Sequence, residues 1–291
     1  MKPFEYVPAR SVAEATAALA EYRERARVLA GGTDLLVELR RPNASTPEAV
    51  VDIGGIDALG GIGDAGDDLT LGPLTRHTQL QRSALVQRHA RLLGVACASV
   101  GSPQIRNRGT LGGNIMNAAT CADTVPPLVA LGARLTLQAR GQRTVNIEDF
   151  FVKPYKTRAE PDEVLVQVTL TKLPAGATSA FIKLGRRNAL SISRLSVAAV
   201  LVRDERGVIT EARIVPGAAL PTWTRVSTAE QMLVGERPSE ALFAAAGQAV
   251  SAAMIAQTGR RWSTEYKEPV IAVLVARALG QCAAGATHVS P

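Results

Sequence analysis

Aromatic side chains are scarce in this sequence, and cysteine is scarcer still. Phe, Tyr and Trp make up 4% of the 291 residues, whereas apolar residues make up 46%, so a core must be built mainly from Ala, Val, Leu and Ile. The three cysteines, Cys97, Cys121 and Cys282, are an odd number without close spacing. This argues against a disulfide framework and against a four-cysteine metal site.

Histidine is equally rare, and long apolar runs are absent. His77, His89 and His288 are isolated, and the sequence shows no metal-binding histidine pair, no nucleophile elbow and no obvious general base. No stretch approaches the roughly 18–20 uninterrupted apolar residues that span a bilayer. The N-terminus carries Glu5 and no apolar segment, so no signal peptide is expected. We therefore expect a cytoplasmic protein, with the inner face of the membrane as the alternative location.

The net charge of +7 raises the question of a nucleic-acid ligand. Lys and Arg are nevertheless scattered among Asp and Glu, and the densest cluster is the pair Arg186-Arg187. No basic stripe with interleaved aromatics is present. We expect no nucleic-acid binding and interpret the charge as a solvated surface, with docking of an acidic partner subunit as the alternative.

The first fifty residues predict a small β-α-β-α-β module. Ser11 and Glu14 form a capping box, and apolar residues follow at helical spacing, which predicts a helix over residues 12–25. The other elements expected in this module are two strands and the helix between them, at residues 28–30, 50–53 and 35–41.

Beyond this module we expect a second subdomain over residues 54–175 and a C-terminal domain over residues 176–285. The boundary lies at Pro174 to Gly176, and residues 286–291 form a loose tail. Strands are predicted at 69–72, 134–138, 164–171, 179–184, 197–203 and 212–215. Helices are predicted at 83–100, 126–131, 227–234, 239–256 and 264–281, and a loop at 101–113.

The segment from Gly61 to Gly66 matches the dinucleotide fingerprint G-x-G-x-x-G. That fingerprint requires a strand before it and a helix after it, so that the helix N-terminus faces the pyrophosphate. Here the strand-like residues 67–71 follow, and Asp64, Asp67 and Asp68 would repel a phosphate. We interpret the segment as a hairpin turn.

The pair Gly31-Gly32 has the context that Gly61 lacks, because a predicted strand ends there and a helix begins. Adjacent glycines leave backbone N–H groups unshielded, and a helix start favours an anion such as pyrophosphate. An ordinary strand-to-helix turn explains this pair equally well when it is taken alone.

A second glycine-rich turn, Gly109 to Asn114, follows roughly eighty residues later. Thr110, Asn114 and Asn117 supply polar groups that can donate to phosphate or to flavin edge atoms. Asp123 lies further on. Its carboxylate can accept a hydrogen bond from a ribose or ribityl hydroxyl. Alternatively, it caps the helix that follows. Two such turns in one chain can approach one diphosphate from both sides.

At these residues the sequence resembles the FAD-binding (medium) subunits of the molybdenum hydroxylases, the carbon monoxide dehydrogenase and xanthine dehydrogenase group. The resemblance covers nearly the whole chain. Its most specific part is the run Gly101 to Asn114, and residues 4–15, 30–35, 181–187 and 265–267 are also typical of the family.

The resemblance implies an α+β fold of the vanillyl-alcohol-oxidase/PCMH type. Two subdomains bind FAD between them, and a C-terminal α+β flavoprotein domain, a small antiparallel sheet with helices, follows. The implied cofactor-binding residues are Leu29, Ala30, Gly31, Gly32, Thr33, Asp34, Leu35, Val100, Gly101, Thr110, Leu111, Gly112, Gly113, Asn114, Asn117, Asp123, Leu165 and Lys183.

Within that set, residues 29–35 and 110–114 are expected to surround the pyrophosphate, and Asp123 to bind a hydroxyl of the sugar chain. Leu165 and Lys183 match positions near the isoalloxazine ring. A cation at Lys183 would favour the anionic reduced flavin, whereas without the resemblance this residue reads as a surface strand lysine.

The resemblance also implies the partners. FAD would be held noncovalently in this chain, since no residue is an evident covalent anchor. A large molybdopterin subunit would oxidise the substrate, and a small subunit with two [2Fe–2S] clusters would pass electrons to the flavin, in a dimer of heterotrimers. Some relatives carry an iron–sulfur cluster in a cysteine-rich insertion, which three dispersed cysteines cannot supply. We therefore expect no metal here.

Two alternatives remain at this point: a stand-alone FAD oxidase or dehydrogenase of the same fold, and a scaffold subunit without flavin.

The substrate of a complex would be a purine, an N-heterocycle, an aldehyde or carbon monoxide. The first turn, Ala30 to Asp34, differs from the Gly-Gly-His-Ser type of carbon monoxide dehydrogenase, which favours a heterocycle or an aldehyde. The final acceptor, whether NAD, quinone, cytochrome or oxygen, is left open.

Overall fold

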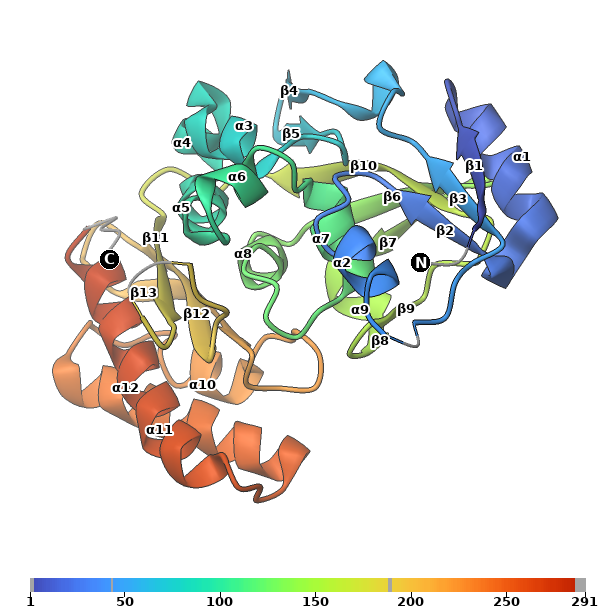
Figure 1. Cartoon of the computed structure of the whole chain (residues 1–291). Helices are drawn as coiled ribbons and strands as arrows, with labels where there is room; N and C mark the ends of the chain where they lie inside the picture. Colours follow the sequence, from blue (N-terminus) through green and yellow to red (C-terminus); the bar gives the residue numbers. More distant parts are fainter. Residues whose placement is uncertain (1–2, 43, 188–189, 286–291) are drawn as a thin grey trace.

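The computed structural model describes residues 3–42, 44–187 and 190–285. Its strands form sheets of three, five and three strands and one two-stranded hairpin. Figure 1 shows the first and last of these sheets at opposite ends of the molecule, with the five-stranded sheet and its helices between them. The expected tail and His288 lie outside the described residues.

The N-terminal sheet is parallel, with strand order β1-β3-β2. Its elements are β1 (Glu5–Pro8), α1 (Val12–Tyr22), β2 (Ala26–Leu29), α2 (Leu35–Leu39) and β3 (Ala49–Asp52). This confirms the β-α-β-α-β module. Ser11 caps α1, since its hydroxyl accepts from the N–H of Glu14 at 3.1 Å. The helix is shorter than predicted, because a 3-10 turn over Arg23–Arg25 follows it.

The central sheet is antiparallel, with strand order β4-β5-β10-β6-β7. Its strands are β4 (Ile62–Ala65), β5 (Asp68–Leu71), β10 (Val164–Thr171), β6 (Arg134–Gln138) and β7 (Gln142–Asn146). The bounds of β6 and β10 are those predicted. The segment from Gly61 to Gly66 runs along β4 into the turn before β5, which confirms the hairpin interpretation. Strand β7 was not predicted, because none of its residues is fully buried.

Six short helices connect β5 to β6. They are α3 (His77–Arg82), α4 (Ala84–His89), α5 (Arg91–Ser99), α6 (Pro103–Arg106), α7 (Leu111–Asn117) and α8 (Val125–Ala130). The single helix predicted over 83–100 is wrong: Ala90, with φ −143° and ψ 41°, interrupts it. The loop predicted over 101–113 is also wrong, because hydroxyl caps at Ser102 and Thr110 begin α6 and α7 within it.

After β6 and β7 come α9 (Ile147–Phe150) and a hairpin of β8 (Phe151–Lys153) and β9 (Lys156–Thr157). The chain then returns through β10, and the expected boundary at Pro174 to Gly176 falls between β10 and the C-terminal sheet. The C-terminal strands are β11 (Thr178–Leu184), β12 (Leu195–Arg203) and β13 (Ile209–Gly217), all antiparallel. Three helices follow: α10 (Ser227–Gln231), α11 (Glu240–Thr258) and α12 (Thr264–Ala283). The C-terminal strands and helices were predicted to within a few residues, whereas α9, β8 and β9 were not predicted.

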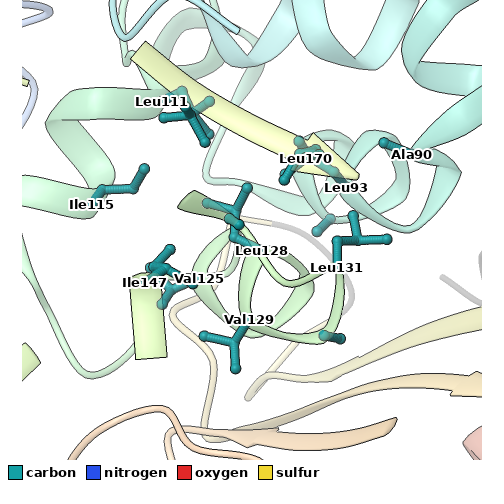
Figure 2. Close-up of a cluster of buried hydrophobic side chains, with 14 of the residues drawn as sticks. Ala90, Leu93, Leu111, Ile115, Val125, Leu128, Val129, Leu131, Ile147 and Leu170 are labelled. Carbon is teal, nitrogen blue, oxygen red and sulfur yellow. The ribbon is translucent and has the colours of Figure 1, made fainter. Parts of the chain in front are cut away.

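Both faces of the C-terminal sheet are buried. Along β12, Val197, Ala199 and Leu201 belong to a core shared with α11 and α12. Ala198 and Val200 belong instead to the core of the central sheet and its helices. Figure 2 shows part of that second core, where side chains from α7, α8, α9 and β10 gather around Leu128. The C-terminal sheet is therefore packed directly against the central sheet and its helices.

Helix α11 is, within the described part of the chain, the one helix that is long and apolar enough to cross a membrane. It is rich in alanine and packs against α12, so closely that a Cβ at Gly247 would overlap the carbonyl oxygen of Ala272. Its buried face includes Phe243, Val250 and Met254.

Candidate functional site

A cavity of about 590 Å³ lies where the N-terminal module, helices α3, α6 and α7, the start of β10 and residues 190–192 meet. This volume is in the range of about 300–1,000 Å³ that is usual for small-molecule sites. All but three of the predicted cofactor-binding residues line it: Ala30, Gly31, Gly32, Thr33, Asp34, Leu35, Val100, Gly101, Thr110, Gly112, Gly113, Asn114, Asn117, Asp123 and Leu165. The structure does not place Leu29, Leu111 or Lys183 on the wall.

The first glycine turn offers free backbone donors. Gly32 has φ +76°, a conformation that glycine adopts without strain. The N–H of Leu36 donates to the carbonyl of Gly32 at 3.1 Å, which starts α2. The N–H groups of residues 31–34 donate to no acceptor in the described part of the chain. Consecutive unpaired N–H groups before a helix form a concave site for an anion.

This turn also contacts the segment that precedes the second turn. A Cβ at Gly31 would overlap the carbonyl oxygen of Arg108 and lie 3.1 Å from the Cα atom of Gly109. Only glycine permits this approach of one backbone to another. The two glycine-rich segments, far apart in the sequence, therefore meet at one wall of the cavity.

The second glycine turn is built differently, because its backbone donors are already used. The N–H of Gly112 donates to Pro73 O at 2.8 Å, and that of Gly113 donates to Thr110 Oγ1 at 3.1 Å. A Cβ at Gly112 would lie 2.5 Å from the Cβ of Pro73, so this glycine serves close packing. The donors left for a ligand are side-chain amides. Asn114 accepts from Thr124 Oγ1 at 2.6 Å through its oxygen, which leaves its NH₂ group available.

Asp123 lies just before α8, and 6% of it is exposed. It does not cap that helix, whose cap position is Thr124. Its Oδ2 accepts from Lys183 Nζ at 2.6 Å, and its Oδ1 accepts a short hydrogen bond from Ser193 Oγ. Burial raises the pKa of Asp123, while the Lys183 ammonium acts in the opposite direction.

Lys183 therefore lies behind Asp123, with its ammonium paired to a carboxylate. The expected position of Lys183 near the flavin ring remains a prediction; the structure adds its ion pair with Asp123. The physical reason is that an ammonium with 13% of its side chain exposed needs a counter-charge, and Asp123 supplies it.

His77, at the start of α3, is a wall residue that the sequence did not indicate. It is 2% exposed, and its Nδ1 has no hydrogen-bond partner among the described residues. Burial, with the nearby Arg106 guanidinium, lowers the pKa of His77 to about 4, so the imidazole is neutral at neutral pH. Its surroundings come from residues 105–110, thirty positions later, which is why it appeared isolated.

Comparison with known proteins decides the family. The model of the FAD binding domain in molybdopterin dehydrogenase matches residues 2–173. The model of the CO dehydrogenase flavoprotein C-terminal domain matches residues 180–282. The chain belongs to the FAD-binding medium subunits of the molybdenum hydroxylases. The resemblance found in the sequence is thereby confirmed.

Relatives of this medium subunit match it over most of its length. It is 34% identical to the xanthine dehydrogenase FAD-binding subunit of Escherichia coli O157:H7, over 97% of this chain and 96% of that one. It is 34% identical to the nicotinate dehydrogenase FAD-subunit of Eubacterium barkeri, over 81% of each chain. A solved structure of carbon monoxide dehydrogenase from Hydrogenophaga pseudoflava superposes with a TM-score of 0.91 at 32% identity, covering 99% of this chain and 100% of that one. The α+β fold with its two family domains is shown by these matches.

The residues of this medium subunit fit an FAD molecule. The unpaired N–H groups of residues 31–34 suit a diphosphate, and the side-chain amides of Asn114 and Asn117 suit polar edges. The buried carboxylate of Asp123 suits a hydroxyl. Among the described residues, no group of three or more His, Cys, Asp or Glu side chains is arranged to hold a metal ion.

Proposed function

We propose that this chain holds one FAD noncovalently in the cavity and serves as an electron relay. It would receive electrons from [2Fe–2S] clusters of a small partner subunit and pass them to an external acceptor. A large molybdopterin subunit of the same complex would oxidise the substrate. The single observation that carries the proposal is the meeting of the two glycine-rich segments on one cavity.

The donors and acceptors of the cavity support one orientation of the cofactor. We assign the diphosphate to the N–H groups of residues 31–34, because they are consecutive, have no acceptor among the described residues and lie directly before α2. We assign a ribose or ribityl hydroxyl to Asp123. Leu165 on β10 supplies an apolar contact for the ring. FAD itself supplies the change between single-electron and two-electron transfer.

The role in a complex is supported by the relatives' names. They include a dehydrogenase complex subunit alpha and a carbon monoxide dehydrogenase medium chain. Within the described residues this chain offers no metal-binding cluster of its own. Because the family model and the relatives are FAD-binding subunits, we assign the hydroxylation chemistry to a partner and propose a dimer of heterotrimers as the assembly.

Purification of the native complex through a tag on this chain tests the proposal. We expect molybdenum, iron and FAD to be recovered with it in fixed ratios, and yellow FAD to be released on acid precipitation. A yellow protein without molybdenum or iron that oxidises a substrate alone would instead support a stand-alone oxidase. A colourless chain would support a scaffold subunit. Flavin retained on the acid-denatured chain would contradict noncovalent binding.

We also propose that the complex acts on an N-heterocycle or an aldehyde. The first turn carries Thr33 and Asp34, and relatives at 34% and 32% identity are named for nicotinate and caffeine. An assay of the native complex with a dye acceptor tests this, using nicotinate, xanthine, an aldehyde and carbon monoxide in parallel. Oxidation of carbon monoxide alone would contradict it.

A further inference from the structure

Helix α12 carries apolar side chains on two faces. One face is buried in the core of the C-terminal domain, and Figure 1 shows the helix on the outer side of the C-terminal sheet. Solvent-exposed apolar residues nevertheless form a second row, which we call the α12 stripe: Trp262, Tyr266, Pro269 and Val273. Trp262 lies just before the helix, and the other three follow at spacings of three and four residues, which places them along one line of its surface.

The α12 stripe is centred on an unusually exposed tryptophan. Trp262 is 89% exposed, and Val273 and Tyr266 are 56% and 45% exposed. A single exposed apolar side chain is ordinary on a protein surface, whereas a row of large ones is typical of an interaction site. Trp and Tyr are also among the residue types that contribute most to binding energy at protein interfaces.

Three cations lie around the start of the α12 stripe. The guanidinium of Arg194 lies over the ring of Tyr266, 5.2 Å from its centroid. Lys267 Nζ and Arg261 Nε each donate to a backbone carbonyl oxygen, at 2.7 Å and 3.1 Å. In the part of the chain that the structure describes, none of these three cations forms a salt bridge with a carboxylate.

These cations also repel one another. Burial lowers the pKa of Lys267, and the positive charges of Arg194 and Arg261 lower it further. A cation whose charge is opposed by its neighbours gains from an anion placed nearby. The arrangement is therefore complementary to a negatively charged surface.

Two acidic residues of α12 do not balance this charge. Glu268 is already paired with Arg260, at 2.9 Å. Glu265 is exposed in the first turn of the helix. Arg277 adds a further exposed cation towards the other end of the helix. Positive charge therefore exceeds negative charge along the α12 stripe.

We propose that the α12 stripe is the docking site for an acidic face of a partner subunit. This inference rests on the proposed function, since that function supplies the partner subunits. A stable interface buries about 800 Å² on each partner, so the stripe would form its apolar centre and not its whole extent. The surrounding cations would form the polar rim, which selects an acidic partner.

A second copy of this chain fits the same surface less well. A two-fold contact sets a surface against itself, so Arg261 and Lys267 would approach their own copies. A lipid surface also fits less well. Helices that lie in a membrane surface bury a broad apolar face, whereas the α12 stripe is a single row beside the acidic Glu265.

Site-specific photo-cross-linking tests the proposal. Trp262 is replaced by p-benzoyl-phenylalanine in the native complex, which is irradiated in the presence of phosphatidylserine vesicles. Mass spectrometry then identifies the molecule attached at this position. We expect a segment of a partner subunit in which Asp and Glu exceed Lys and Arg. A cross-link to a second copy of this chain, to lipid or to a neutral or basic segment would overturn the proposal, as would the absence of any cross-link.

Dissociation of the complex on dilution gives an independent readout. Trp262→Ala should weaken the association of this chain with its partners by about tenfold or more, as at a binding hot spot. Arg261→Glu should weaken it more at low than at high ionic strength, because salt screens exposed charges. Mass photometry over a series of concentrations measures both variants. Unchanged dissociation in either variant would overturn the proposal.

Arg206→Glu is the matched control for charge. Arg206 lies in the turn between β12 and β13, at the opposite end of β12 from Arg194, and 82% of its side chain is exposed. This variant makes the same change of charge away from the α12 stripe and should leave dissociation unchanged. A loss equal to that of Arg261→Glu would show a general effect of net charge and would overturn the proposal.

FAD content and the circular dichroism spectrum should be unchanged in all these variants. If the unmodified chain is recovered with neither partner subunit, the proposed function fails, and the docking site fails with it. If the complex is recovered with molybdenum and iron but is insensitive to changes in the α12 stripe, the docking site alone fails. The two failures are therefore distinguishable.

Discussion

At the residue scale, glycine serves two separate purposes in the cavity wall. Gly31 allows two backbones to touch, and with Gly32 it leaves N–H groups unpaired. Gly112 and Gly113 have their N–H groups paired, and Gly112 packs against Pro73. The sequence predicted both turns but not this difference, because the partners of the second turn come from residues 73–75, almost forty positions earlier. The ion pair of Lys183 was not predicted for the same reason: its partner lies sixty residues away.

Gly31→Ala tests the contact between the two segments. The added Cβ would overlap Arg108 O, so the backbones must separate and widen the anion site. We expect at least about a tenfold loss of FAD affinity, on the order of 1.4 kcal/mol. Gly55→Ala is the matched control, because a Cβ there meets no atom within 4 Å. FAD titration of both variants checks this, and equal affinities would contradict the assignment of the first turn.

His77 gives the molecule a pH-dependent stability. The pKa of His77 is about 4 in the folded state, against about 6.5 in an unfolded chain. Between these values the unfolded state binds more protons, so the free energy of unfolding decreases as the pH falls. From pH 7.5 to pH 5 the wild type should lose about 2 kcal/mol more than His77→Phe, which cannot be protonated. Urea denaturation at the two pH values measures this, and equal losses would refute it.

At the element scale, the strands were predicted best where burial is one-sided or complete. β6, β10 and the three C-terminal strands follow from their apolar patterns. The short helices around the cavity do not follow from an apolar pattern, because tertiary contacts rather than periodicity set their ends. Ala90 interrupts the predicted helix although alanine favours helices, and nothing in its local sequence signals the break. The loop prediction failed at α6 and α7, where the hydroxyl caps were a readable but overlooked signal.

Thr110→Ala tests the cap of α7. The Thr110 hydroxyl accepts from the N–H of Gly113, and two glycines follow the cap, so the first turn has little intrinsic helix preference. We expect a loss of about 1 kcal/mol in the free energy of unfolding. Thr110→Ser keeps the acceptor and should lose much less. Denaturant unfolding measures both variants, and identical losses would show that the methyl group, not the cap, matters.

At the scale of the whole molecule, the two family domains share a core. Val200 on β12 and Trp223 pack in the same cluster as Leu128 of the FAD-binding domain. The predicted boundary at Pro174 to Gly176 is a chain connection and not a gap in the packing. The sequence patterns predicted that connection. They did not predict the shared apolar cluster, because this depends on which face of β12 packs against α8.

The shared core predicts a single unfolding transition. Trp223 is 3% exposed within it, while Trp262, the other tryptophan, is 89% exposed. In a Trp262→Phe variant, the fluorescence of Trp223 should therefore report the junction between the domains. We expect its denaturation midpoint to coincide with that of the far-ultraviolet circular dichroism signal. Separate midpoints would show that the two domains unfold independently.

The position of Lys183 and Ser193 also sets an order of events during synthesis. A ribosome that has released only the first 175 residues has delivered both glycine turns and Asp123, but neither of the residues that hold the carboxylate. The nascent chain cannot complete its binding site until β11 and the start of β12 have emerged. We therefore expect cofactor loading to be a late step that follows translation of the second domain.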